Sequence, residues 1–205
     1  MLDNLKKYHL ILASNSPRRR ELLSGLGIEF EVRVMPGIDE SYPSMPASDV
    51  AGFIAEKKAQ AYLPDLRDDE LLITADTVVI VDDEILGKPA DAADAHRMLR
   101  QLSGRTHQVI TGVCIATNRD ARFSRNSRDS GDSKVSFSVS TDVTFKQLFD
   151  EEIDYYITHY RPFDKAGAYG IQEWIGYIGV TGLCGSYFNV MGLPVQRIYQ
   201  ELTKF

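Results

Sequence analysis

The hydrophobic pattern of this chain predicts buried strands that alternate with helices. Continuous apolar runs at 10–12 and 71–81 are typical of strands buried on both faces of a sheet. Further strands are expected at 29–35, 85–86, 108–118, 135–145, 169–171 and 177–180, and helices at 50–63, 91–102, 148–159 and 194–202. This order, with some hairpins, predicts an α/β fold whose long mixed sheet is flanked by helices.

Polar stretches separate these elements without any Pro-rich linker or internal repeat. The segment 36–46 is expected to be a loop that carries the acidic pair Asp39-Glu40, and 185–192 a turn region. The polar stretch 119–134 is expected to form a long hairpin loop. We therefore expect residues 1–205 to form a single domain, in two lobes around a central cleft.

The segment after the first strand predicts a helix whose N-terminus binds an anion. Ser16 is the expected N-cap, because Pro17 then occupies the first helical position, where its missing N–H costs nothing. Arg18 and Arg19 follow in the first turn, where positive charge is unfavourable for an isolated helix. A phosphate chain at this end would explain the arrangement. The alternative is a solvated basic surface patch.

Composition narrows the classes of function. A net charge of −6 and a pI of about 5.2 argue against a nucleic-acid or membrane-surface role, since both need a basic field. Cys114 and Cys184 lie far apart and outside any metal or redox spacing, so both are expected to be reduced. No signal peptide or membrane span is indicated, and we expect a cytoplasmic protein.

Two carboxylates are candidates for the chemistry. Asp76 lies within the apolar run ITADTVVIV, where a carboxylate is costly unless it is paired or coordinates a metal. It is expected at a sheet edge that faces the cleft, the alternative being that it caps a neighbouring turn. Glu40 is expected near the same end of the sheet, the alternative being an ordinary exposed loop acid.

Basic and amide side chains complete the candidate set. Lys88 lies between Gly87 and Pro89, a rigid turn that could direct its amine at phosphate, and Arg105 follows a helix end. Lys58 lies on a predicted helix, with a solvated face as the alternative. Gln172 could contact a base edge through its paired donor and acceptor. The histidines are scattered, and no Walker A or G-x-G-x-x-G motif is present.

Six ordered blocks resemble the Maf family of nucleoside triphosphate pyrophosphatases over about residues 10–194. They are LILASNSPRRRELL, ITADTVV, GKP, LSGRTHQVITGV, DKAGAYGIQ and GSYFNVMGLP. The resemblance implies the fold of the inosine triphosphate pyrophosphatases. It also implies hydrolysis of a nucleoside triphosphate to the monophosphate and pyrophosphate with Mg²⁺ or Mn²⁺, and a role in removing modified nucleotides.

The resemblance also assigns roles to residues. Asp76 matches the family's proposed proton acceptor, and with Glu40 it would hold the metal. The branch that acts on dTTP and UTP carries Arg, Thr and Gln at three specificity positions, which here are Arg18, Thr77 and Gln172. The 7-methyl-GTP branch carries Trp, Gln and Glu there. The family's other polar cleft residues match Ser14, Arg19, Lys58, Lys88 and Arg105.

Other functions remain open at this point. A nucleotide-binding regulator of cell division would bind nucleotide without releasing pyrophosphate, and a metal-dependent phosphatase would release orthophosphate instead. The pyrophosphatase reaction with modified pyrimidine triphosphates is a third alternative. The expected partner is a nucleoside triphosphate, without nucleic acid or membrane. A homodimer is compatible with the sequence, which shows no specific interface.

Overall fold

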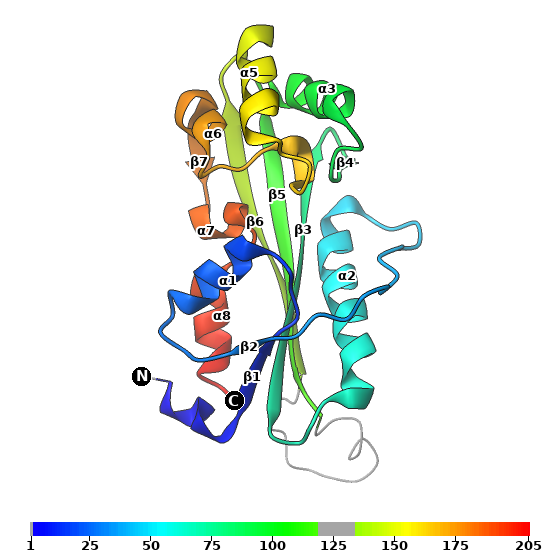
Figure 1. Cartoon of the computed structure of the whole chain (residues 1–205), viewed down its shortest axis with the longest axis vertical. Helices are drawn as coiled ribbons and strands as arrows, with labels where there is room; N and C mark the ends of the chain where they lie inside the picture. Colours follow the sequence, from blue (N-terminus) through cyan, green and yellow to red (C-terminus); the bar gives the residue numbers. More distant parts are fainter. Residues whose placement is uncertain (1, 119–133) are drawn as a thin grey trace.

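The computed structural model describes residues 2–118 and 134–205, and these form a mixed α/β structure around one sheet (Figure 1). The predicted loop over 119–134 lies outside the described residues except for Lys134. The predicted fold class is confirmed. Across the described residues, no helix is both long and apolar enough to span a membrane.

The sheet contains seven strands in the order β2-β1-β3-β5-β6-β7, with β4 paired to β3. Strand β1 pairs parallel with β2 and with β3, whereas the pairs β3–β4, β3–β5, β5–β6 and β6–β7 are antiparallel. The strands are β1 (His9–Leu12), β2 (Glu31–Val32), β3 (Glu70–Val81), β4 (Glu84–Leu86), β5 (Thr106–Thr117), β6 (Lys134–Phe145) and β7 (Val180–Cys184).

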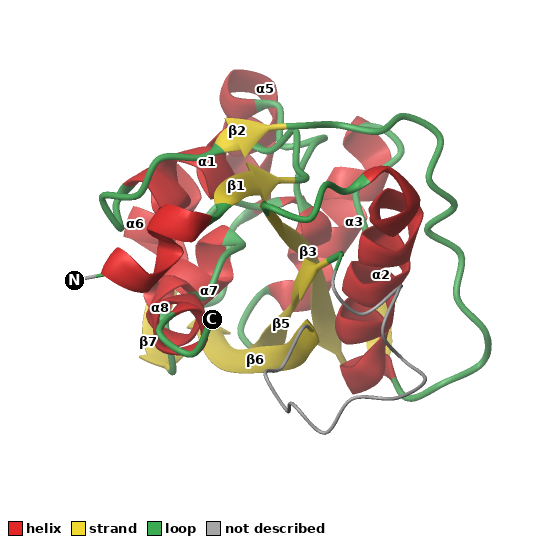
Figure 2. Cartoon of the chain, turned by 90° about the horizontal axis from the view of Figure 1, so that it is seen from below, coloured by secondary structure: helices red, strands yellow, loops and turns green. Residues whose placement is uncertain are grey.

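Helices cover both faces of the sheet (Figures 1 and 2). Helix α2 (Ala47–Tyr62) covers one face, and α1 (Pro17–Ser24), α7 (Tyr187–Met191) and α8 (Val195–Leu202) cover the other. Helices α3 (Ala92–Leu102), α5 (Asp150–Tyr160) and α6 (Trp174–Gly179) gather at the end of the sheet shown uppermost in Figure 1. Short 3₁₀ segments are η1 (Asp3–Lys7), η2 (Leu63–Asp65) and η3 (Ala166–Ala168).

The two faces of the sheet hold separate parts of the core. Ile11 and Leu72 lie side by side on β1 and β3 and pack toward Ala59 of α2. Their neighbours Leu12 and Ile73 belong to the core on the other face, with buried residues of α1 and α8. Successive strand residues point to opposite faces, so the long apolar runs of the sequence are explained by a sheet covered on both sides.

Gly112 of β5 lets α2 approach the sheet unusually closely. A Cβ at this position would lie 2.4 Å from the carbonyl oxygen of Ala51 and 2.4 Å from the backbone nitrogen of Gly52. Gly112 is the register partner of Asp76 on β3. The glycine therefore sets how close α2 comes to the middle of β3.

We expect Gly112→Ala to destabilise the protein by about 1–3 kcal/mol, because the added methyl overpacks a backbone contact. Urea unfolding measures this change. Gly87→Ala is the matched control, since a Cβ there meets no atom within 4 Å. Equal stability of the two variants would contradict the close packing of α2.

Several predicted elements are present with changed bounds, and some are wrong. The strand expected at 29–35 is limited to Glu31–Val32, and the helix expected at 50–63 begins earlier, at Ala47. The expected strand at 169–171 is not regular structure, and 177–180 is mostly the end of α6. Within the expected turn region 185–192, a short helix forms, capped by Ser186.

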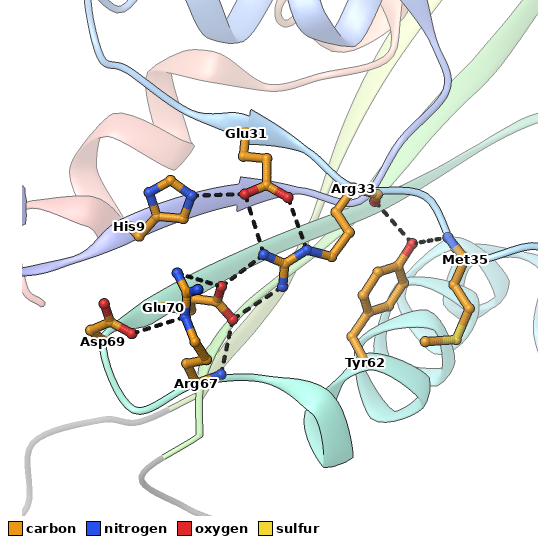
Figure 3. A network of polar contacts seen from close by, with 8 residues as sticks. All are labelled: His9, Glu31, Arg33, Met35, Tyr62, Arg67, Asp69 and Glu70. Carbon is orange, nitrogen blue, oxygen red and sulfur yellow. Dashed lines mark hydrogen bonds and ion pairs between the residues drawn. The ribbon is translucent and has the colours of Figure 1, made fainter.

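Ion pairs connect the residues at the end of β2 with the start of β3 and the turn before it (Figure 3). The fully buried side chain of Glu70 accepts two hydrogen bonds from Arg33, at 2.7 and 3.1 Å. Arg67 adds a contact at 3.1 Å, and Glu31 binds the other side of the Arg33 guanidinium. Tyr62 of α2 hydrogen-bonds to the backbone at Arg33 and Met35. The chain is therefore held at the point where it enters the loop that carries Glu40.

Candidate active site

The candidate site lies where one edge of β3 lacks a neighbouring strand. Strand β5 covers one edge of β3 from Leu71 to Ile80. On the other edge, β1 pairs only as far as Ile73 and β4 begins pairing at Val79. The cavity that opens over this gap has a volume of about 780 Å³. Residues on both faces of β3 can therefore reach one cavity, which matches the predicted cleft.

A lysine joins the two candidate carboxylates at this cavity. The Lys58 Nζ atom of α2 lies 2.8 Å from Asp76 Oδ1 and 2.9 Å from Glu40 Oε1. The side chains of Asp76 and Lys58 are 15% and 14% exposed. Asp76 therefore does not cap a turn, and Lys58 is not on a solvated face. The close approach of α2 at Gly112 brings Lys58 to Asp76.

The N-terminus of α1 forms another wall of the cavity. Ser16 caps the helix as predicted, and its hydroxyl accepts a hydrogen bond from the Arg19 backbone N–H at 3.4 Å. The Ser14 hydroxyl accepts one from the Ser16 N–H at 3.2 Å. Residues Ser14 to Arg19 all line the cavity. The partial positive charge at a helix N-terminus favours an anion there.

The two arginines of this turn serve different purposes. Arg18 pairs with Asp164 at 2.8 Å and lines the cavity. Arg19 donates to Gly192 O at 2.9 Å, Ala75 O at 2.8 Å and Thr77 Oγ1 at 3.0 Å. Burial lowers the pKa of Arg19 from its ordinary value. Arg19 thus holds the start of α1 against β3, and three of its five N–H donors are committed to protein groups.

Two further predicted residues line the cavity. Lys88 is exposed, and its ammonium has no carboxylate partner within the described ranges 2–118 and 134–205. The Gln172 carbonyl oxygen is buried and accepts no hydrogen bond from any described residue. Both side chains therefore have unused polar groups at a cavity, which is typical of ligand-binding residues.

Arg105 lies outside this arrangement. Its guanidinium pairs with Asp82 in the turn between β3 and β4, and its side chain is 52% exposed. It does not contribute to the lining of the cavity. All the other predicted site residues do: Ser14, Arg18, Arg19, Glu40, Lys58, Asp76, Thr77, Lys88 and Gln172.

The segment before Gln172 contains a buried ion-pair network that the sequence pattern does not predict. Lys165 is 8% exposed and lies 2.7 Å from Asp164 and 3.0 Å from Glu173. The Tyr156 hydroxyl donates to Glu173 and accepts the Gly170 N–H at 3.0 Å. Although burial favours the neutral acid, hydrogen bonds from Lys165 and Arg18 bring the pKa of Asp164 to about 2.

The sequence feature that marks these ion pairs is the charged pair Asp164-Lys165 directly before a run of small residues. Gly170 lies at their centre, since a Cβ there would meet the Gln172 amide nitrogen at 3.0 Å and Lys165 Cε at 3.1 Å. The ion pairs thus hold the backbone that carries Gln172.

Comparison with known proteins identifies the family. The family model described as Maf-like protein matches residues 9–205. The chain belongs to the Maf family. A Phocaeicola vulgatus relative named dTTP/UTP pyrophosphatase is 58% identical over 205 residues, covering 100% of both chains. A Bacteroides thetaiotaomicron relative of the same name is 51% identical, again over 100% of both chains.

Among solved structures, the Staphylococcus aureus Ham1 protein shares the fold. It has a TM-score of 0.52 and 14% sequence identity, over 94% of this chain and 98% of the other. The fold and the family that the sequence blocks predicted are therefore confirmed.

Proposed function

We propose that this Maf-family protein hydrolyses nucleoside triphosphates, with dTTP and UTP preferred, to the monophosphate and pyrophosphate. The observation that carries this proposal is the Glu40–Lys58–Asp76 cluster in a cavity whose wall is a helix N-terminus. Relatives that are 51–58% identical over the whole chain bear the name dTTP/UTP pyrophosphatase, which supports the same reaction.

The charge distribution suits a triphosphate. Lys88 and the positive end of the α1 dipole are available to bind phosphate oxygens, and Arg18 and Lys165 add positive charge nearby. Asp164 and Glu173 already neutralise part of the charge of Arg18 and Lys165. We therefore assign the phosphate chain chiefly to Lys88 and the α1 N-terminus.

The residues present fit a divalent metal ion that binds together with substrate. Glu40 and Asp76 converge on one point, because both lie within 3 Å of the same Lys58 nitrogen. No group of three or more His, Cys, Asp or Glu side chains within the described ranges could hold a metal. Mg²⁺ is commonly bound by one or two carboxylates plus substrate phosphates. When bound, such an ion would polarise the α-phosphate and acidify a bound water.

Asp76 would act as the general base. In this proposal its carboxylate takes a proton from the water that attacks the α-phosphorus, and the bond to the bridging oxygen of pyrophosphate breaks. Lys58 holds the Asp76 carboxylate in place through its hydrogen bond at 2.8 Å. Lys88 and the α1 N-terminus would stabilise the negative charge that develops on the leaving pyrophosphate.

Product analysis tests this function. Purified protein with Mg²⁺ or Mn²⁺ is expected to convert UTP and dTTP to UMP or dTMP and pyrophosphate, with little turnover of GTP or 7-methyl-GTP. Orthophosphate as the first product would contradict the proposal in favour of a phosphatase. Nucleotide binding without turnover would contradict it in favour of a regulator.

Gln172 is expected to contact the pyrimidine. Changing Gln172 to Glu removes the amide donor and adds a negative charge, so we expect the kcat/KM for dTTP to fall about tenfold or more, the loss of a hydrogen bond of about 1.4 kcal/mol. Steady-state kinetics with dTTP and GTP measures this effect, and a thermal melt controls for stability. An unchanged substrate profile would count against the assignment.

The cellular role follows from the same reaction. We propose removal of modified pyrimidine triphosphates before their incorporation into nucleic acid, in the cytoplasm where the nucleotide pool is used. Inclusion of 5-methyl-UTP and pseudouridine triphosphate in the substrate panel tests this role. Turnover of both at rates at least equal to that of UTP is the expected result.

A further inference from the structure

A chain of hydroxyl groups leads from the candidate site into the core. Arg19 donates to Thr77 Oγ1 at 3.0 Å, and Thr77 Oγ1 lies 2.9 Å from Thr111 Oγ1. Thr111 in turn donates to the backbone carbonyl oxygen of Asn189 at 3.1 Å. Thr77 and Thr111 are register partners on β3 and β5, and they contact residues of α1 and α7. Only Thr77 of these two lines the cavity.

The contact between Thr111 and the backbone carbonyl oxygen of Asn189, which also accepts the Gly192 N–H, orients the other bonds of this chain. A carbonyl oxygen can only accept, so the single hydroxyl proton of Thr111 lies on the bond to Asn189. The contact between the two threonines must then use the proton of Thr77. Thr77 also accepts from Arg19. Its hydroxyl has one lone pair left and no proton to give to a ligand.

The end of the chain is rigidly held. Thr111 and Asn189 are fully buried. The Asn189 side chain donates to Val109 O and Thr141 Oγ1, both at 3.0 Å, which ties α7 to β5 and β6. The Asn189 carbonyl that receives the Thr111 proton therefore has little freedom to move, and Thr77 keeps its orientation.

We propose that Thr111 is a positioning residue that makes Thr77 an obligate acceptor toward the base, and that this acceptor selects the imide N–H of uracil and thymine. This inference rests on the proposed function. Uracil and thymine present a carbonyl, an N–H and a second carbonyl along one edge. Arg18 and the Gln172 amide supply donors at the same cavity, and Thr77 supplies the acceptor. Cytosine carries an unprotonated nitrogen in place of the N–H and would face the Thr77 lone pair.

The test compares UTP with CTP in Thr111 variants. Thr111→Val keeps the volume but removes the acceptor for the Thr77 proton, so the Thr77 hydroxyl becomes free to donate to cytosine. We expect the ratio of kcat/KM for UTP to that for CTP to fall about tenfold, mainly through faster CTP hydrolysis. Thr111→Ser keeps the hydroxyl and is expected to retain the wild-type ratio. A purely structural role would slow both substrates alike.

A second background shows whether Thr111 acts through Thr77. In a Thr77→Val protein, adding Thr111→Val is expected to leave the ratio of kcat/KM for UTP to that for CTP unchanged. The Thr77 hydroxyl, through which Thr111 is proposed to act, is already absent there. If Thr111→Val does not fold, Thr111→Cys replaces it. Its thiol is a weak acceptor, so an intermediate ratio is expected.

The outcomes separate this inference from the proposed function. Wild-type protein that turns over neither UTP nor dTTP would overturn the proposed function, and this inference with it. Wild-type preference for UTP, together with a ratio in Thr111→Val within twofold of wild type, would overturn the role of Thr111 alone.

Discussion

Replacement of Asp76 by asparagine is expected to lower kcat for UTP about 10²- to 10⁴-fold, the usual contribution of a general base. Asparagine keeps the shape of the side chain but cannot take the proton of the attacking water. The fold is expected to persist, because Lys58 can still donate to the amide oxygen at the position of Asp76 Oδ1. Pyrophosphate release under saturating UTP measures the effect.

The control for this variant is Asp82→Asn. Asp82 is also a carboxylate and directly follows β3, but it pairs with Arg105 in an exposed turn outside the cavity. Asparagine tolerates its positive φ of 50°. We expect activity within twofold of wild type. Near-normal turnover by Asp76→Asn would remove Asp76 from the chemistry.

Replacement of Glu70 by glutamine is expected to destabilise the protein by about 3 kcal/mol. The side chain of Glu70 is fully buried and binds Arg33 through two hydrogen bonds (Figure 3). Removal of one partner of a buried ion pair leaves the other charge uncompensated. Urea unfolding at pH 7 measures this loss. Glu31→Gln is the matched control, because Glu31 binds the same arginine but is 42% exposed, and a much smaller loss of stability is expected.

The same ion pair predicts a dependence of stability on pH. Hydrogen bonds from Arg33 lower the pKa of Glu70 from its ordinary 4.5 to about 2 in the folded protein. A carboxylate with a lowered pKa stabilises the fold fully above its unfolded value and loses that contribution as the pH falls toward the folded value. Wild-type stability should therefore decline between about pH 4.5 and 2 more steeply than that of Glu70→Gln. Parallel curves would contradict this role of Glu70.

The elements with strong local signals could be predicted from the sequence. The Ser16 cap with Pro17 in the first helical position and the apolar run of β3 both lie where expected. At 177–180 the strand prediction failed, because a run of four residues does not separate the helical from the strand periodicity. There, burial of Ile175 and contact of Gly176 with the Ile171 carbonyl favour a helix turn. These contacts depend on the tertiary structure.

Some residues of the candidate site could likewise be predicted from the sequence, and others could not. Asp76 was recognisable because a carboxylate within an apolar strand needs a partner, and the structure supplies Lys58. Lys165 and Thr111 were not recognisable in the same way, since a lysine beside small residues and a threonine in a strand are common. Their importance comes from burial and from partners distant in sequence, such as Glu173 and Asn189. The sequence therefore indicated nine of the residues that line the cavity but not the bonds that orient them.

Hydrolysis in water enriched in ¹⁸O tests the central claim most directly. If Asp76 activates a water that attacks the α-phosphorus of UTP, the label will appear in UMP and pyrophosphate will be unlabelled. Mass spectrometry of both products measures its distribution. Label in pyrophosphate would show attack at the β-phosphorus, and label in orthophosphate would show removal of the terminal phosphate; either result would contradict the proposed reaction.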